Sequence, residues 1–325
     1  MEAALAALGP RAWPRDSAMR EMEALDAMRA KLIFRNDPDY PQLLALLEDA
    51  PLVLAAQGDL RALTLRGVAL VGARNASAIA RRFAEDLADG LAVRDICVVS
   101  GLARGIDAAA HTGALRSGST IAAIAGGLDR PYPRENAALQ ARIAAEGGLV
   151  LSEAPLGTAP LARHFPRRNR IVAGLSLGVV VVEAALQSGT LITARLAAEA
   201  GRELFAVPGS PLDPRSRGSN DLIRRGARLT ETVEDVLQFL PEAPSALPIL
   251  RLAELPETPE YTPEDTPAPS EAAAQVLEMM GTTPIAVDEL GRRCQLSPQS
   301  LSAVLLDLEL AGRIETLPGN RVALA

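Results

Sequence analysis

The chain has 325 residues, of which 48% are hydrophobic and 22% are charged, a composition typical of a soluble globular protein with two or three domains. It contains no run of about 18 uncharged apolar residues that would span a membrane, and its N-terminus lacks the basic region of a secretory signal. The two cysteines, Cys97 and Cys294, follow neither a disulfide nor a metal-binding spacing. We therefore expect a cytoplasmic protein with no membrane span, no bound metal and no cofactor.

The net charge of −7 is distributed unevenly along the chain. Residues 61–230 carry 22 basic and 14 acidic side chains, a net of +8, whereas residues 1–60 have a net of −4 and residues 231–325 a net of −11. An arginine-rich genome would explain the excess of arginine over lysine, but not this segregation along the chain. The basic middle segment therefore indicates an anionic partner. The only lysine, Lys31, lies outside it, which excludes a Walker-type phosphate lysine there.

The first 60 residues are predicted to form a helical segment and a lead-in with several prolines. The stretch SAMREMEALDAMRAKLIF places apolar residues at helical spacing, so we expect residues 1–36 to be helical. From Gly67 onward, short apolar runs alternate with alanine-rich amphipathic segments, which predicts a parallel sheet with helices on both faces. We therefore predict a doubly wound, Rossmann-like α/β domain over residues 61–240, with about six strands at 68–72, 96–101, 120–126, 149–153, 177–184 and 203–209.

The rest of the chain is predicted to hold a linker and a small second domain. Residues 241–270 contain eight prolines and six acidic residues, a composition that indicates an extended linker. The pattern over residues 271–325 predicts three helices and a hairpin, with Ser270 and Ser297 as helix caps and the hairpin turn at Pro318-Gly319-Asn320. Three helices followed by a hairpin are typical of a winged helix.

The third helix of this module, predicted over residues 298–311, carries Asp307 and Glu309 and no basic side chain. A helix that enters the major groove of DNA needs positive charge to approach the phosphates. We therefore predict a module that contacts protein, with Arg292 and Arg293 as its only DNA contacts.

Polar, glycine-rich turns follow several of the predicted strands. Ligands of an open parallel sheet bind at the carboxyl ends of its strands, and helix N-termini at such turns favour anions. The segment GARNAS follows the first strand, SGLARGIDAAAH the second and QSGTLITA the fifth. Any single glycine is explained by a turn that needs positive φ. Several such turns along one edge, with Arg74 and Arg104 on two of them, predict a track for a chain of phosphates.

The segment ARHFPRRNRI places Phe165 among the arginines 163, 167, 168 and 170, in a chain that is only 3% aromatic. A solvated basic face is the alternative interpretation of this run. An aromatic ring among arginines is, however, a common way to hold single-stranded nucleic acid, because bases stack on the ring while phosphates pair with the guanidinium groups.

Catalytic patterns are weaker. Asp107 and His111 are four residues apart and would share a helix face, but no G-x-S-x-G segment places a nucleophile, and Asp107 would equally cap its helix. Glu153 and Glu183 end two predicted strands, so a carboxylate-assisted reaction on a nucleotide remains an alternative. The segment GARNAS is not the G-x-G-x-x-G of a dinucleotide site.

Seven segments follow one another along the chain: VGARNAS, VSGLARGIDAAAH, GGLDRPYPREN, LSEAPLG, HFPRRNRIVAGLS, VVEAALQSGTLITARLAAEAGRELFAVPG and GSNDLIRRGA. In this order they resemble the DNA-processing protein A family, also called DprA or Smf. The resemblance implies an extended Rossmann-like core that binds single-stranded DNA and forms a homodimer. It implies a protein that protects incoming DNA and loads the RecA recombinase during natural transformation. It also implies an N-terminal SAM-like domain, shortened here, within residues 1–60 and a winged helix within residues 271–325.

Carried over residue by residue, the resemblance places Arg74 at the phosphate-gripping arginine and Phe165 against a base. Ala162 stands where the family often has lysine, and Arg163, one position later, is the candidate to substitute for it, although the sequence does not give the direction of its side chain. Together with the basic residues above, the predicted DNA contacts are Gly72, Arg74, Asn75, Ser100, Gly101, Arg104, Gly105, Asp107, Arg163, Phe165, Asn169, Arg170, Ser188, Gly189 and Thr190. The predicted dimer or RecA contacts are Gly218, Asn220, Leu222 and Ile223.

The alternative function is a nucleotide-processing enzyme, because related Rossmann-like folds include phosphoribohydrolases of the lysine-decarboxylase-like group. Those enzymes carry a PGG-x-GT-x-x-E signature. Here QSGTLITARLAAE keeps only Gly189-Thr190, without a glutamate at the expected spacing. We therefore predict a protein that binds DNA and is not an enzyme.

Overall fold

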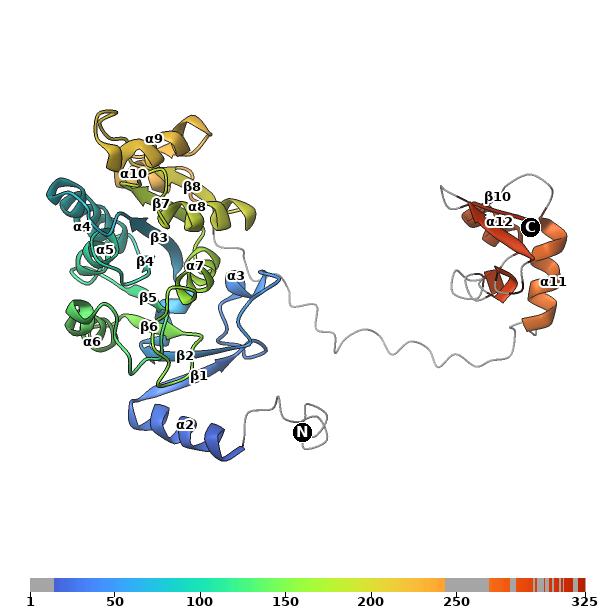
Figure 1. The fold of residues 1–325 in the computed structure, drawn as a ribbon, viewed down its shortest axis with the longest axis horizontal. Coiled ribbons are helices and arrows are strands. Elements are labelled where there is room, and N and C mark those ends of the chain that lie inside the picture. Colours follow the sequence, from blue (N-terminus) through green and yellow to red (C-terminus); the bar gives the residue numbers. More distant parts are fainter. Residues whose placement is uncertain are drawn as a thin grey trace. The chain divides into compact units, whose positions relative to one another are not determined.

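The computed structural model describes residues 15–242, 269–280 and 285–294, together with shorter stretches between residues 296 and 324. The chain divides into two compact units, Met1–Ser245 and Ala246–Ala325 (Figure 1). Over the stretches that the structure describes, no helix is both long enough and apolar enough to cross a membrane. The expectations for residues 1–14 and for the linker at residues 243–268 lie outside the described residues.

The first unit is built on a sheet of nine strands in the order β1-β2-β6-β5-β4-β3-β7-β8-β9. In this order, neighbouring strands from β6 through to β9 (Arg228–Leu229) run parallel. Strand β2 (Val53–Gly58) pairs antiparallel with both β1 (Ala30–Phe34) and β6. The central strands are fully buried, as their continuous apolar sequences predict. The prediction of a Rossmann-like parallel sheet is therefore confirmed. The six predicted strands are β3 (Arg66–Gly72), β4 (Ile96–Ser100), β5 (Thr120–Ile124), β6 (Leu149–Ser152), β7 (Gly178–Val182) and β8 (Glu203–Ala206).

Helices cover both faces of this sheet, because successive strand residues point to opposite sides (Figure 1). In β3, Val68 and Leu70 pack with helices α4 (Ala78–Ala92) and α5 (Ile106–Ala114). The alternating residues Ala69 and Val71 pack with α7 (His164–Gly174) and α8 (Thr190–Glu199) on the other face. Helix α6 (Ala137–Ala145) covers the same face of the sheet as α4 and α5, because its Ile143 packs with Ala122 of β5. The carboxyl ends of β3 and β7 are thus held between two packed helical layers.

The helical prediction for residues 28–36 is wrong. Helix α2 (Arg15–Ala27) ends at Ala27, Arg29 adopts a positive φ of 54°, and Ala30–Phe34 forms edge strand β1. Strand β1 pairs with β2 (Val53–Gly58), which lies in the predicted lead-in. A short apolar run such as AKLIF fits a helix or a strand equally well, so periodicity alone does not separate them.

Shorter elements complete the first unit. The short strand β9 (Arg228–Leu229) extends the parallel part of the sheet beyond β8. The remaining elements are α3 (Gln42–Ala45), α9 (Arg217–Arg224), α10 (Val233–Leu237) and the 3₁₀ turns η2 (Leu60–Thr64), η3 (Arg134–Asn136) and η4 (Pro214–Ser216).

The second unit contains helices and a small antiparallel sheet, as predicted for a winged helix. Val276, Leu290 and Val322 lie in its core. The strands pair in the order β10-β12-β11, so the predicted hairpin is present, although its turn residues 318–320 and the cap at Ser297 lie outside the described residues. The elements are α11 (Pro269–Met279), β10 (Ile285–Ala286), α12 (Val287–Cys294), β11 (Ile314–Leu317) and β12 (Arg321–Leu324).

His111 makes the stability of the first unit dependent on pH. It is fully buried in α5, its Nδ1 lies 2.7 Å from the Thr120 hydroxyl, and burial lowers the pKa of His111 to about 3. Because the folded protein holds this imidazole neutral, the associated stability is complete above the ordinary histidine pKa and is lost as the pH falls toward 3. We expect the free energy of unfolding to drop by about 2 kcal/mol between pH 7 and pH 5 from this group alone.

Urea unfolding at the two pH values tests this prediction. His111→Gln is expected to remove most of the acid-induced loss, whatever its effect on stability at neutral pH. His164→Gln is the matched control, because these are the only two histidines in the chain. An equal acid-induced loss in wild type and His111→Gln would contradict the assignment.

Candidate nucleic-acid interface

A pocket of about 770 Å³ opens at the carboxyl ends of β3 and β7. Three turns build its walls: β3–α4, β4–α5 and β7–α8, which were predicted to lie at one edge of the sheet. The start of α7 closes the fourth side with Phe165 and Asn169. Of the predicted DNA contacts, the pocket brings together Gly72, Arg74, Asn75, Asp107, Phe165, Asn169, Ser188, Gly189 and Thr190.

The glycines of these turns allow close packing of one turn on another. A Cβ atom at Gly72 would lie 2.0 Å from the Val182 carbonyl oxygen, so no side chain fits there. Gly105 has a φ of 76°, and its Cβ would lie 2.2 Å from the Ala73 carbonyl oxygen. The Thr190 hydroxyl donates a hydrogen bond of 2.9 Å to the Gly72 carbonyl oxygen. Gly72 and Gly105 therefore hold the turns together, and the side chains around them face the pocket.

Arg74, Phe165 and Tyr132 form an aromatic cluster at the pocket. The Arg74 guanidinium carbon lies 5.1 Å from the centroid of the Phe165 ring, within the range of a cation–π contact. The Tyr132 ring lies 5.6 Å from the Phe165 ring at an interplanar angle of 59°. Arg74 and Tyr132 are exposed, and Arg74 makes no ion pair with any carboxylate that the structure describes. The cluster thus offers a free cation and aromatic surface side by side.

The floor of the pocket contains Arg168, which is only 6% exposed. Its charge partner is Asp107, a buried carboxylate that accepts hydrogen bonds of 3.2 Å from the backbone amides of Gly101 and Ala103. Burial lowers the pKa of Arg168 and raises that of Asp107. The Asp107 charge partly offsets the shift of Arg168, and the Arg168 charge partly offsets the shift of Asp107. A Cβ at Gly101 would lie 1.3 Å from Nη1 of Arg168, so this glycine leaves the space that the guanidinium fills.

Six predicted contacts do not line the pocket. Gly101 and Gly105 lie behind it and have the packing roles just described. The Ser100 hydroxyl is buried and donates to the Leu70 carbonyl oxygen at 2.6 Å. Arg104 is ion-paired with Glu135, and Arg163 is exposed just before α7.

Arg170 does not fit its predicted role as a phosphate contact. It is buried, and it forms ion pairs of 2.6 Å with Glu153 and 3.3 Å with Asp49. Glu153 also pairs with Arg167 at 3.1 Å. Because α7 turns Arg170 away from the pocket and toward two carboxylates, Arg170 is not among the proposed DNA contacts.

The carboxylates that suggested an enzyme have structural partners. Glu153 is held by Arg167 and Arg170, and both oxygens of Glu183 accept hydrogen bonds from Ser77, at 2.9 Å from its amide and 2.6 Å from its hydroxyl. The Ser77 hydroxyl in turn accepts from the Ala80 amide and caps α4. Glu183 therefore anchors the start of α4. Within the described residues, no group of three or more His, Cys, Asp or Glu side chains is arranged to hold a metal ion.

Residues that the sequence did not identify also line the pocket. Tyr132 lies in GGLDRPYPREN, and its aromatic character in a chain with three tyrosines was an available signal. Arg215 comes from the loop between β8 and α9, which no sequence pattern connected to the site. Arg168 belonged to the basic run, but nothing in the run distinguished it from Arg170.

The four predicted dimer or RecA contacts fasten α9 to the sheet. The Gly218 amide donates a hydrogen bond of 2.6 Å to the Ala184 carbonyl oxygen. The side-chain amide of Asn220 donates a hydrogen bond of 2.8 Å to the Gly209 carbonyl oxygen and accepts one of 3.1 Å from the Gly209 backbone amide. Leu222 and Ile223 pack against the main core. A role in binding a partner therefore stays a prediction for these residues.

Comparison with known proteins agrees with the fold. The profile of the DNA recombination-mediator protein A family matches residues 31–241, and that of the DprA winged helix domain matches residues 260–320. Protein Smf of Escherichia coli is 40% identical over 315 residues, which cover 96% of this chain and 82% of that protein. The chain belongs to the DNA recombination-mediator protein A family.

Two solved structures of this family resemble this chain over about two thirds of its length. The X-ray structure of DprA from Streptococcus pneumoniae superposes with a TM-score of 0.64 and 43% identity, covering 68% of this chain and 78% of that one. DprA from Helicobacter pylori, whose structure concerns its single-stranded DNA binding mode, superposes with a TM-score of 0.59 and 31% identity, covering 65% of this chain and 95% of that one.

Proposed function

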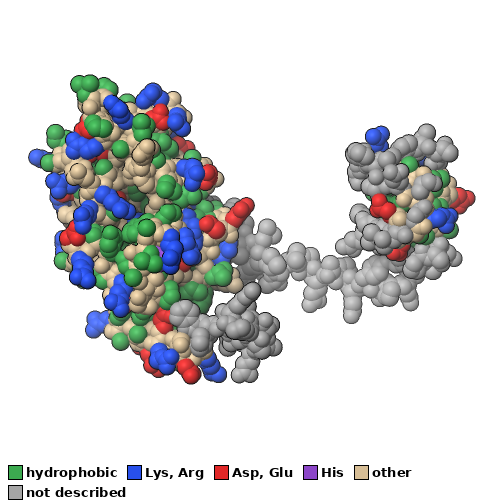
Figure 2. Space-filling model, in the orientation of Figure 1, with side chains coloured by type: hydrophobic (Ala, Val, Ile, Leu, Met, Phe, Trp, Pro, Cys, Tyr) green, Lys and Arg blue, Asp and Glu red, His purple; other side chains and the backbone are tan. Residues whose placement is uncertain are grey.

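We propose that this chain binds single-stranded DNA in the pocket at the carboxyl ends of β3 and β7, without a chemical reaction on the DNA. The observation that carries the proposal is the aromatic cluster, in which Arg74, free of any described carboxylate, lies over the Phe165 ring. Figure 2 shows basic side chains (Lys and Arg) spread over the face of the first unit that it draws. The single-stranded DNA binding of the Helicobacter pylori relative supports the proposal.

The pocket suits a single strand better than a duplex. Stacking on Phe165 or Tyr132 requires the face of an unpaired base, whereas the bases of a duplex are already stacked on each other. Arg74 would pair with a phosphate of the same strand and release a counterion. Such binding tolerates any base sequence, because every base has an aromatic face.

Fluorescence anisotropy with labelled single-stranded and double-stranded oligonucleotides across a salt series tests the proposal. We expect preference for the single strand and an affinity that falls with salt, with a logarithmic slope of about −0.7 for each phosphate engaged. Equal affinity for the duplex, or no binding at low salt, would contradict the proposal. The second outcome would favour the nucleotide-processing alternative, which a screen for nucleotide turnover then tests.

Phe165→Ala should weaken single-stranded DNA binding by roughly 5- to 100-fold, because stacking of one base is worth about 1–3 kcal/mol. Phe239→Ala is the matched control: its ring lies 3.7 Å from the Arg228 guanidinium carbon in a second arginine–phenylalanine pair, outside the pocket. Anisotropy should show the loss of affinity of Phe165→Ala for both a thymidine and an adenosine oligonucleotide. Similar affinities for the two variants would remove Phe165 from the site.

We further propose that the protein acts as a homodimer that delivers the bound strand to RecA. The membership in a family of recombination mediators supports this proposal. The test is whether the protein speeds RecA filament formation on DNA covered by a single-strand binding protein, with light scattering to measure the oligomeric state. A monomer without effect on RecA would contradict it.

A further inference from the structure

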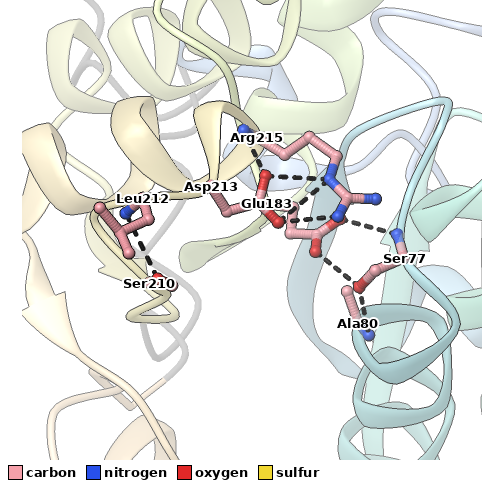
Figure 3. Close-up of polar contacts among 7 residues, drawn as sticks. All are labelled: Ser77, Ala80, Glu183, Ser210, Leu212, Asp213 and Arg215. Carbon is pink, nitrogen blue, oxygen red and sulfur yellow. Dashed lines mark hydrogen bonds and ion pairs between the residues drawn. The ribbon is translucent and has the colours of Figure 1, made fainter.

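The loop between β8 and α9 brings Arg215 to the wall of the DNA pocket. One edge of its guanidinium donates hydrogen bonds to the Asp213 carboxylate: Nε lies 3.1 and 3.2 Å from the two carboxylate oxygens, and Nη2 lies 2.7 Å from Oδ2. Figure 3 shows the Arg215 side chain beside both Asp213 and Glu183. The guanidinium edge that carries Nη1 has no hydrogen-bond partner among the described residues.

The loop that holds this pair is a fixed structure. The Asp213 carboxylate also accepts a hydrogen bond of 2.9 Å from the Arg215 amide, which caps η4. The Asp213 amide donates to the Ser210 carbonyl oxygen at 3.0 Å. The double hydrogen bond between Asn220 and Gly209 ties the base of the loop to α9. Arg215 is therefore presented to the pocket in a defined position, and Asp213 sets the direction of its free edge.

Asp213 is the carboxylate that accepts the hydrogen bonds of the Arg215 guanidinium. Glu183 also raises the pKa of Arg215, but both of its oxygens are engaged by Ser77. The Arg215 side chain remains 43% exposed, so its ion pair with Asp213 is of the weak, solvent-screened kind. Exchange of Asp213 for a phosphate oxygen would cost little, and the released carboxylate would be hydrated by solvent.

We propose that Asp213 and Arg215 form a latch that lowers the affinity of the pocket for single-stranded DNA. In the free protein the Asp213 carboxylate neutralises the Arg215 guanidinium. When DNA binds, a phosphate of the strand replaces Asp213 as the ion-pair partner of Arg215. Arg215 is thus an additional DNA contact, and Asp213 is a positioning residue that weakens it. The proposal rests on the pocket being the DNA site.

Asp213→Asn tests the latch, because asparagine caps a helical turn as well as aspartate does but carries no charge. Its affinity for a labelled thymidine oligonucleotide at low salt should rise by roughly two- to fivefold, the range of an exposed ion pair. The salt slope should steepen by up to about 0.7, the value for one phosphate on a single strand. The gain should vanish in the double variant Asp213→Asn/Arg215→Gln.

Glu199→Gln is the matched control, because it removes the same charge from an exposed ion pair with Arg195 on α8, outside the pocket. Equal affinities for Asp213→Asn and Glu199→Gln, or a gain that persists without Arg215, would overturn the latch. Arg74→Ala, measured in parallel, separates the two proposals. If it abolishes binding while Asp213→Asn behaves as the control, the DNA site stands and the latch fails; if it leaves binding unchanged, the site itself fails.

Discussion

Replacing Arg168 with methionine should lower the free energy of unfolding by up to about 3 kcal/mol, because the buried Asp107 carboxylate loses its attraction to this buried cation. It should also weaken single-stranded DNA binding, since Arg168 lies at the floor of the pocket. Urea unfolding and anisotropy measure the two effects. The double variant Arg168→Met/Asp107→Asn should recover most of the stability but not the DNA affinity.

Arg167→Met is the control for this prediction. Arg167 is the preceding residue in the chain, but its side chain is 68% exposed and its ion pair with Glu153 is on the surface. Its replacement should change stability by less than about 1 kcal/mol. If both methionine variants lose the same stability, the buried pair is not the cause. If the double variant stays as unstable as Arg168→Met, packing rather than charge explains the loss.

Replacing Arg74 with alanine should weaken binding of single-stranded DNA by roughly 10- to 100-fold at low salt, because a hydrogen bond to a charged group is worth about 1.5–3 kcal/mol. The variant should lose about 0.7 from the salt slope. Its stability should stay close to that of the wild type, since the Arg74 side chain is exposed and lies over the Phe165 ring without an ion pair to any described carboxylate.

Arg228→Ala provides the comparison for Arg74→Ala. Both substitutions remove an exposed arginine that lies over a phenylalanine ring, but Arg228 lies outside the pocket. A protein that binds DNA by net positive charge alone would lose the same affinity in both variants. A loss confined to Arg74→Ala supports the pocket as the binding site.

The sequence was sufficient to predict the layers of the fold and the edge of the sheet at which the pocket opens. Continuous apolar strands separated by helices leave little alternative to a parallel sheet, and its carboxyl edge follows from the topology. Strand β1 was missed because AKLIF has no periodicity that separates a strand from a helix, and its pairing with β2 is set by contacts distant along the chain.

The candidate site was also predicted from the sequence only in part. The motifs identified Arg74 and Phe165, but the run RRNR did not reveal that Arg168 would face Asp107 whereas Arg170 would face Glu153. That outcome depends on the rotation of α7 against its neighbours. Arg215 could not be predicted, because the loop that carries it reaches the pocket only after β8 and α9 have packed.

The location of the bound strand is the central claim, and photo-crosslinking tests it most directly. An oligonucleotide containing bromodeoxyuridine, irradiated in complex with the full chain and mapped by mass spectrometry, should crosslink to the peptides that carry Phe165 and Tyr132. Phe165→Ala should lose its own crosslink and keep the one at Tyr132. Crosslinks confined to residues 271–325, or to parts of the first unit away from the pocket, would contradict the account.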